Sequence, residues 1–399
     1  MEKIDLNHKS ILVTGGAGFI GSNLIKRLFA DTEGTTIINI DNENDYYDVR
    51  LKAWRKKELE QLVPEGITYH YIKGDIADKA TVDGIFETYK PQIVVNLAAQ
   101  AGVRYSITNP DAYIQSNLIG FYNILEACRH SSLGSGPKTK SQGSGPKTKS
   151  QGTGPSENLT SGPDPSDKNF SSGPDPRGKV VHLVYASSSS VYGGNKKVPF
   201  STDDRVDNPV SLYAATKKSN ELMAHCYSKL YDIPTTGLRF FTVYGPAGRP
   251  DMAYFGFTNK LLKGETIQIF NYGNCRRDFT YVDDIVEGIV RVMQGAPERK
   301  KGEDGLPVPP YAVYNIGGGQ PENLLDFVQI LQEELVAAGV LPKDFDFEAH
   351  KQLVPMQPGD VPTTYADATA LERDFGFTPK ITLREGLREF ARWYKQFYG

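Results

Sequence analysis

The sequence predicts an α/β protein, in which a doubly wound parallel sheet is followed by a smaller C-terminal α/β lobe that binds substrate. Two observations predict this fold class. Short apolar runs alternate with segments of helical periodicity over residues 1–245, and such alternation is typical of a parallel sheet with helices on both faces. Beyond this point the alternation loosens. We therefore expect residues 1–245 to form the sheet domain and residues 246–399 to form mainly the substrate lobe.

Each expected element follows from a local pattern. In the sheet domain, apolar and β-branched runs predict strands at 11–13, 35–41, 67–76, 93–99, 180–185 and 235–244. Helical spacing predicts helices at 19–29, 49–61, 77–89, 111–130 and 209–231. In the C-terminal lobe, the same criteria predict strands at 265–269 and 314–317 and helices at 282–293, 321–338 and 383–397.

Residues 131–178 interrupt this pattern. The segment Gly-Ser-Gly-Pro-Lys-Thr-Lys-Ser-Gln occurs at 134–142 and again at 143–151, and large apolar residues are scarce throughout. A stretch rich in Gly, Ser, Pro and Lys cannot bury a core. We expect a disordered insertion between a helix and the next strand.

Composition excludes several classes of partner. The formal net charge is −3, so nothing indicates a nucleic-acid-binding surface. No apolar stretch is long enough to span a bilayer, and we expect no membrane partner. The cysteines Cys128, Cys226 and Cys275 are far apart and lack the spacing of metal ligands. We expect no metal site, and a protein of the reducing cytoplasm.

Three glycines, Gly15, Gly18 and Gly21, separate the first strand from the first helix. Glycines at such spacing let the chain turn sharply and let a pyrophosphate approach the backbone amides at the helix N-terminus. The second strand ends in Asp41, about 20 residues further on, where an acid hydrogen-bonds the adenosine ribose and repels a 2′-phosphate. The pattern therefore predicts binding of NAD rather than NADP.

A candidate catalytic pair lies on the helix predicted at 209–231. Tyr213 and Lys217 are four residues apart and share a helix face. We expect the Lys217 ammonium to lower the pKa of Tyr213 toward neutrality, so that Tyr213 acts as a general base on a sugar hydroxyl. A surface pair without function is the alternative. Four consecutive serines, 187–190, follow the fifth strand, and we expect these hydroxyls to lie beside the cofactor.

Together, these motifs resemble those of the extended short-chain dehydrogenase/reductase family, which includes NAD-dependent epimerases and dehydratases with a Rossmann-like sheet. The resemblance covers nearly the whole chain except residues 131–178, where this chain departs from the family pattern. Within the family, residues 41–49, 98–106 and 242–252 are most similar to the UDP-glucuronate 4-epimerase group.

The resemblance implies an isomerase that interconverts UDP-glucuronate and UDP-galacturonate through a transient 4-keto sugar, with NAD held tightly. Tyr213 would take the proton of the C4 hydroxyl, with Ser188 as a relay, and Lys217 would hold the nicotinamide ribose. The residues expected to line the cofactor are Gly15, Gly18, Phe19, Ile20, Asp41, Asn42, Asp75, Ile76, Ala98 and Ala99.

A uronic acid substrate adds a hazard, because its 4-keto form is a β-keto acid that loses carbon dioxide easily. The enzyme must hold the carboxylate so that the breaking bond stays out of line with the carbonyl π-system. The candidates for this clamp are Ser189, Ser190, Thr242 and Arg249, of which the arginine suits bidentate carboxylate binding. Arg277 resembles the arginine that binds the diphosphate in the family. For both arginines a surface ion pair is the alternative.

Related dehydratases and decarboxylases carry an acidic residue just before the Val191-Tyr192-Gly193 run. Here Ser189 and Ser190 occupy those places, which argues against both activities. A UDP-glucose 4-epimerase is the runner-up, because its Ser, Tyr and Lys would look alike. A non-catalytic nucleotide sensor would usually have lost the tyrosine or the lysine. The resemblance also implies a homodimer formed through helices at 109–130 and 210–231.

Overall fold

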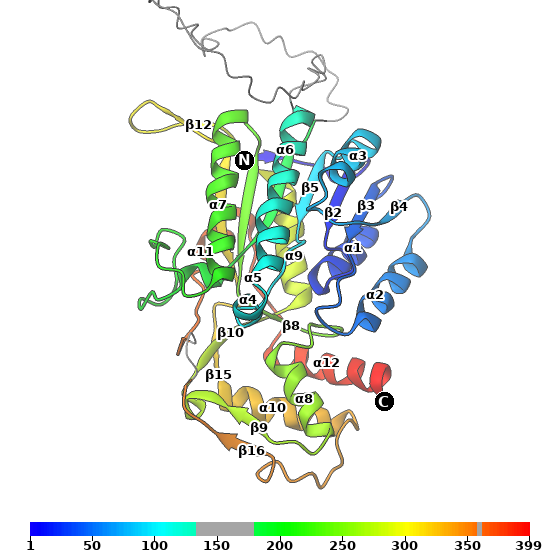
Figure 1. The fold of residues 1–399 in the computed structure, drawn as a ribbon, viewed down its shortest axis with the longest axis vertical. Coiled ribbons are helices and arrows are strands. Elements are labelled where there is room, and N and C mark those ends of the chain that lie inside the picture. The colour runs from blue at the N-terminus through cyan, green and yellow to red at the C-terminus, as the bar shows by residue number, and fades with distance from the viewer. Residues whose placement is uncertain (133–178, 357–360) are drawn as a thin grey trace, which may run out of the picture.

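A seven-stranded parallel sheet forms the centre of the computed structural model, which describes residues 1–132, 179–356 and 361–399 (Figure 1). The predicted insertion at 131–178 lies outside the described residues from 133 onward. The strand order is β14-β7-β6-β5-β2-β3-β4, and every pairing between neighbours is parallel. The strands are β2 (Ser10–Thr14), β3 (Thr36–Asp41), β4 (Thr68–Lys73), β5 (Ile93–Asn96), β6 (His182–Ser188), β7 (Thr235–Phe240) and β14 (Tyr311–Ile316). This confirms the predicted doubly wound fold.

Alternating side chains of the strands enter two separate apolar cores, because successive residues of a strand point to opposite faces. Ile11 and Val13 of β2 enter one core and Leu12 enters the other. The first core contains side chains of α1 (Phe19–Asp31), α2 (Val49–Leu62) and α9 (Val282–Met293). The second contains side chains of α3 (Lys79–Tyr89), α6 (Gly120–Ser132) and α7 (Leu212–Tyr231). Both faces of the sheet are thus covered.

The helix expected at 111–130 contains an irregular turn. Its α-helical parts, α5 (Pro110–Tyr113) and α6, flank a π-helical segment, η1 (Ile114–Ile119). Within this segment Asn117 is buried and bonds both backbone groups of Gln100, accepting from N at 2.8 Å and donating to O at 3.0 Å. It also donates to Thr216 of α7 at 3.0 Å. The widened turn therefore ties the loop after β5 to α7.

The strand expected at 235–244 is in fact two strands. The Phe241 amide donates to the Ile316 carbonyl, which is the last bond to the large sheet on this side. The next residues form β8 (Thr242–Tyr244), which pairs with β10 (Arg276–Tyr281) instead. The chain thus leaves the sheet at Phe241 and enters the C-terminal lobe.

Part of the segment after residue 245 returns to the large sheet. Strand β14 forms the sheet edge beside β7, and α9 packs on the face that α1 covers. The division into residues 1–245 and 246–399 remains a prediction, with these two elements belonging to the sheet layer. The helix predicted at 321–338 begins later than expected, because residues 321–323 form β15 (Pro321–Asn323) and only then α10 (Leu324–Ala337) follows.

The C-terminal lobe lies beyond the carboxyl ends of the large sheet (Figure 1). Among its described residues it contains two small sheets and three longer helices. The sheets are β15-β10-β8 and β16-β9, where β9 is Ile267–Ile269 and β16 is Lys351–Leu353. The helices are α8 (Ala253–Leu262), α10 and α12 (Leu383–Tyr398). Phe279 and Phe327 stack at 4.5 Å between ring centroids in its core. No helix among the described residues has the length and apolar character required to cross a membrane.

Candidate active site

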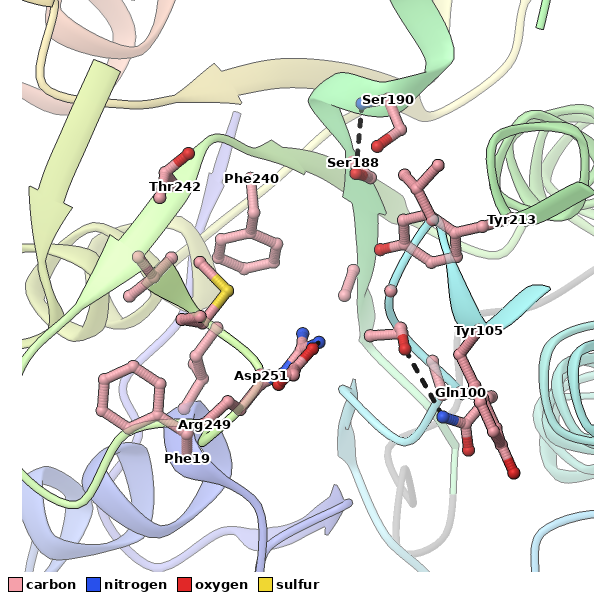
Figure 2. Close-up of a pocket in the computed structure, with 18 of the residues that line it drawn as sticks. Phe19, Gln100, Tyr105, Ser188, Ser190, Tyr213, Phe240, Thr242, Arg249 and Asp251 are labelled. Carbon is pink, nitrogen blue, oxygen red and sulfur yellow. Dashed lines mark hydrogen bonds and ion pairs between the residues drawn. The ribbon is translucent and has the colours of Figure 1, made fainter. Parts of the chain in front are cut away.

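A cavity of about 970 Å³ lies between the carboxyl ends of the large sheet and the C-terminal lobe. Ligands of doubly wound sheets bind at this edge. Every residue that the sequence singled out for cofactor, catalysis or substrate lines the cavity wall. Figure 2 shows Tyr213 with Ser188 and Ser190 on one side, and Arg249 with Asp251 pointing into the same space. The structure therefore brings together residues that are up to about 260 positions apart in the sequence, from the loop after β2 to β10.

The glycine loop after β2 is shaped so that only small residues fit. Gly15 has a φ of +73°, and a Cβ there would lie 2.8 Å from the Ala98 nitrogen. A Cβ on Gly18 would lie 2.8 Å from the Gly15 carbonyl oxygen. Gly18 is the N-cap of α1 and offers no side-chain acceptor, so the first amides of the helix keep their capacity to bind an anion. This cradle fits the pyrophosphate of a dinucleotide.

Acidic side chains at the ends of β3 and β4 fix the adjacent loops. Asp41 accepts hydrogen bonds from the Ala17 amide at 3.1 Å and from the Glu43 amide at 2.8 Å. Asn42 donates to Asp75 at 2.9 Å. These carboxylates are placed where an adenosine would lie beside the glycine loop, and with that loop they fit NAD.

Lys52 is a cavity residue that the sequence did not single out. Its Nζ lies 3.8 Å from Oδ1 of Asp41 and donates to Asn44 at 2.8 Å. Its side chain is 7% exposed. It comes from the first turn of α2, a helix for which the sequence predicted no site residue.

The candidate catalytic side chains come from β6 and from the start of α7. Ser211 caps α7 by accepting a hydrogen bond from the Ala214 amide at 3.1 Å, which places Tyr213 in the first turn. Ser188, the last residue of β6, lies beside Tyr213 in the cavity wall (Figure 2). Lys217 is 3% exposed and donates to the Ala186 carbonyl at 2.9 Å. The three side chains therefore meet at one point of the cavity wall.

The sequence predicted that Lys217 lowers the pKa of Tyr213, and the structure contradicts this prediction. Burial raises the pKa of Tyr213 above its ordinary value, and the Ser188 hydrogen bond and the Arg249 charge oppose this only in part. The Lys217 ammonium is directed to the Ala186 carbonyl instead, and burial lowers the pKa of Lys217 itself to about 8. In this structure, therefore, desolvation outweighs the favourable charges around the tyrosine.

The residues predicted to hold the sugar carboxylate line the same cavity, and Ser190 lies near Ser188 and Tyr213 (Figure 2). Ser189 and Ser190 lie on a short turn, η2 (Ser189–Tyr192), and Thr242 begins β8. Arg249 is about three-quarters buried and forms an ion pair with Asp251, donating from Nε at 3.1 Å and from Nη2 at 2.5 Å. Asp251 also accepts from the Tyr46 hydroxyl at 3.3 Å. Sequence reasoning gave Asp251 no role, because a single acid two residues after an arginine is too common to indicate one.

Arg277 lies on β10 and also lines the cavity. Its Nη1 donates to the carbonyls of Arg276 at 3.0 Å and Pro362 at 3.1 Å. The neighbouring Asp278 is fully buried and accepts from the amides of Gly318, Gly319 and Ala366. Burial raises the pKa of Asp278 to about 6. Asp278 thereby anchors the strand from which Arg277 projects.

A glycine cradle, an acid at the end of β3 and a Ser–Tyr–Lys group occur together in this cavity. The family model described as the NAD dependent epimerase/dehydratase family matches residues 11–317. The chain belongs to this family. The fold and the NAD dependence predicted for this epimerase/dehydratase are confirmed by the match, together with the parallel sheet.

Individual relatives of this epimerase/dehydratase are similar over nearly its full length. The probable UDP-glucuronate 4-epimerase of Rhizobium meliloti is 39% identical, over 97% of each chain. UDP-glucuronate 4-epimerase 2 of Arabidopsis thaliana is 40% identical, over 98% of this chain and 77% of the plant protein. A crystal structure of UDP-glucuronic acid 4-epimerase from Bacillus cereus, in complex with UDP-glucuronic acid and NAD, aligns with a TM-score of 0.73 and 27% identity. That alignment covers 98% of this chain and all of the other.

Proposed function

We propose that this protein is a NAD-dependent UDP-glucuronate 4-epimerase. One observation carries the choice of a uronate among the UDP-sugars: the cavity already holds a carboxylate against an arginine. The Asp251 carboxylate binds Arg249 at two points, and Arg249 lines the same cavity as Tyr213 (Figure 2). A sugar carboxylate that took this place would lie within range of the catalytic tyrosine. The similarity to enzymes named for UDP-glucuronate supports the same choice.

In the proposed reaction, Tyr213 takes the proton of the C4 hydroxyl, and Ser188, which lies beside Tyr213, orients that hydroxyl. When bound, NAD accepts a hydride from C4 and returns it to the other face of the sugar. Lys217 is assigned to the ribose next to the nicotinamide, because its buried ammonium lies at the end of β6. The Gly15–Gly18 loop and Asp41 hold the adenosine diphosphate half. Arg277 is assigned to the diphosphate of the UDP-sugar.

The carboxylate clamp is assigned to Ser189, Ser190, Thr242 and Arg249. Hydroxyls and a guanidinium fork can hold both carboxylate oxygens and so fix the plane of the group. Fixing that plane keeps the C5–C6 bond out of line with the C4 carbonyl during the 4-keto stage. The clamp thus explains how the intermediate is retained without loss of carbon dioxide.

A UDP-glucose 4-epimerase is the second candidate, and one observation favours it. Because Asp251 neutralises Arg249, the pair presents no net charge to the cavity and would suit a neutral sugar. To separate the two, UDP-glucuronate and UDP-glucose are incubated separately with the protein and the sugars are followed by proton NMR. We expect UDP-galacturonate from the first and little or no UDP-galactose from the second. UDP-galactose as the only product would favour the hexose enzyme.

We also propose that the protein is a homodimer of the cytoplasm. Helices α6 and α7 lie next to each other (Figure 1). Both leave large apolar side chains exposed. On α7, Leu222 is 60% exposed and Leu230 is 65% exposed, and Tyr122 of α6 is 44% exposed. A second copy of the same helix pair would cover them in a twofold arrangement. The thiols of Cys226 and Cys275 are not in disulfides, which suits a reducing compartment.

A further inference from the structure

Arg55 is a buried arginine in the middle of α2, and every N–H of its guanidinium has an acceptor. It is 1% exposed. Its Nε and Nη2 donate to the Ala247 carbonyl at 3.1 and 2.5 Å, and Nη2 also donates to the Gly248 carbonyl at 3.1 Å. Its Nη1 donates to the Ala17 carbonyl at 3.1 Å and to the Tyr47 hydroxyl at 3.0 Å. These bonds use all five donors of the group.

This guanidinium is not paired with a carboxylate: within residues 1–132, 179–356 and 361–399, no salt bridge to Arg55 is formed. The group is held by carbonyl dipoles, a hydroxyl and the face of the Tyr47 ring, 5.6 Å from its centroid. A buried charge without a carboxylate partner is expensive in stability. A well-packed apolar side chain would fill the same space at lower cost. The arrangement therefore indicates a role in fixing geometry.

Three segments that surround the cavity meet at Arg55. Ala17 belongs to the glycine loop, Tyr47 to the loop after β3, and Ala247 and Gly248 to the loop that carries Arg249. Ala247 has a φ of +51°, a left-handed conformation that alanine rarely adopts. Its carbonyl receives two of the donors of Arg55. These bonds hold the backbone in that conformation two residues before Arg249.

We propose that Arg55 is a positioning residue that fixes Arg249 relative to the glycine loop, and that this orientation keeps the 4-keto uronate from losing carbon dioxide. The inference rests on the proposed function. If the clamp is misaligned, the C5–C6 bond of the 4-keto sugar breaks and carbon dioxide leaves. The electron pair forms the C4–C5 enolate, which takes a proton from water at C5 and gives a UDP-4-keto-pentose. The hydride removed from C4 then stays on the cofactor, so one reduced nicotinamide remains for each carbon dioxide released.

The test compares three purified full-length variants with the wild type. Arg55→Met removes the donors and keeps an unbranched stem, and Arg55→Lys keeps a charge without the planar fork. Lys57→Met is the matched control, because it removes a positive charge from an exposed position of the same helix. Each protein is incubated with UDP-glucuronate, and released carbon dioxide, UDP-galacturonate and reduced nicotinamide are quantified. NAD freed by denaturation and the melting temperature are measured for each preparation.

We expect Arg55→Met to raise the ratio of carbon dioxide to UDP-galacturonate at least tenfold, with reduced nicotinamide equal to the carbon dioxide released. Arg55→Lys should raise it at least threefold, and Lys57→Met should match the wild type. We also expect a lower NAD content in Arg55→Met, because the Ala17 contact is lost. A folded Arg55→Met with the wild-type ratio would overturn the proposal. If Arg55→Met does not fold, the ratio measured for Arg55→Lys tests the proposal. Loss of fold in both variants would show a purely structural role for Arg55 and overturn the proposal. If the wild type forms no UDP-galacturonate, it is the proposed function that fails.

Discussion

Arg249 and Asp251 form a two-point ion pair inside the cavity, with Nε to Oδ1 at 3.1 Å and Nη2 to Oδ2 at 2.5 Å. Both side chains keep about a quarter of their surface exposed, so the pair is open to the cavity. The Asp251 carboxylate stands where an anionic group of a ligand can compete for the same guanidinium. Binding of a uronate therefore requires Arg249 to exchange one carboxylate for another, or to serve both.

We predict that Asp251→Asn strengthens the binding of UDP-glucuronate. The variant keeps the shape of the side chain and removes the negative charge that competes with the substrate. A partly exposed ion pair of this kind contributes about 1 kcal/mol, so the Kd should fall about fivefold. Calorimetric titration of wild type and variant measures the Kd of UDP-glucuronate. UDP-glucose, whose sugar is neutral, is the comparison, and its Kd should change little. Weaker binding of UDP-glucuronate would mean that Asp251 holds Arg249 in place for the substrate.

We predict that Tyr213→Phe abolishes epimerisation while the protein keeps its cofactor. Loss of a positioned general base lowers kcat by roughly 10²- to 10⁴-fold. The glycine loop and Asp41, which are assigned to the cofactor, do not bond Tyr213. Turnover and NAD content are measured on the same preparation. Tyr272→Phe, at a position that is 54% exposed, is the matched control. Full activity in Tyr213→Phe would remove the tyrosine from its assigned role.

We predict that Lys217→Met gains stability at neutral pH and loses activity. Burial lowers the pKa of Lys217 to about 8 from an ordinary value of 10.5, so the charged form is disfavoured in the folded protein. The resulting loss of folding stability is fully present below pH 8. Stability recovers as the pH rises from 8 toward 10.5, because the unfolded chain then binds more protons than the folded one.

Burying the charged Lys217 ammonium costs about 3 kcal/mol of folding free energy. The substitution removes this cost, but it also removes the hydrogen bond to Ala186, which contributes about 1 kcal/mol to stability. Lys217→Met should therefore be more stable by about 2 kcal/mol at pH 7, and the difference should shrink above pH 8. Denaturant unfolding of the NAD-free wild type and variant, at pH 7 and at a pH above 8, measures this difference in unfolding free energy. A difference that does not depend on pH would contradict the assigned protonation behaviour.

We predict that the double variant Leu222→Glu and Leu230→Glu is monomeric at micromolar concentration. Four charges, two from each copy, would have to be buried in the proposed interface of α7, which is unfavourable without partners. Light scattering measures the mass of wild type and variant. Leu353→Glu is the control, because Leu353 is 46% exposed and belongs to β16 in the C-terminal lobe, away from α7 (Figure 1). A wild type that is monomeric under these conditions would rule out the dimer.

The sequence was sufficient for features that depend on neighbours in the chain. The glycine loop, the acid at the end of β3 and the i,i+4 pair Tyr213 and Lys217 each follow from local spacing. A parallel sheet brings its carboxyl ends together whatever the connecting helices contain. For this reason residues chosen by local pattern, such as Gly15, Asp41 and Ser188, line one cavity.

The remaining features depend on contacts between distant segments. Arg55 and Ala247 are 192 positions apart, and no local pattern indicates that they meet. The break at Phe241 arises because β8 pairs with β10 while β7 pairs with β14, although apolar and β-branched residues predominate throughout 235–244. The effect of Lys217 on Tyr213 was wrongly predicted because spacing gives proximity but gives neither burial nor the competing acceptor, the Ala186 carbonyl.

In the proposed reaction, the chain epimerises a uronate at C4 and returns the same hydride to the same sugar. The most direct measurement uses UDP-glucuronate deuterated at C4, incubated with the protein in ordinary water without added cofactor and followed by proton NMR. We predict UDP-galacturonate that retains deuterium at C4. UDP-galacturonate carrying protium at C4 would contradict the return of the hydride, and unchanged UDP-glucuronate, or a UDP-pentose as the main product, would contradict the assigned reaction.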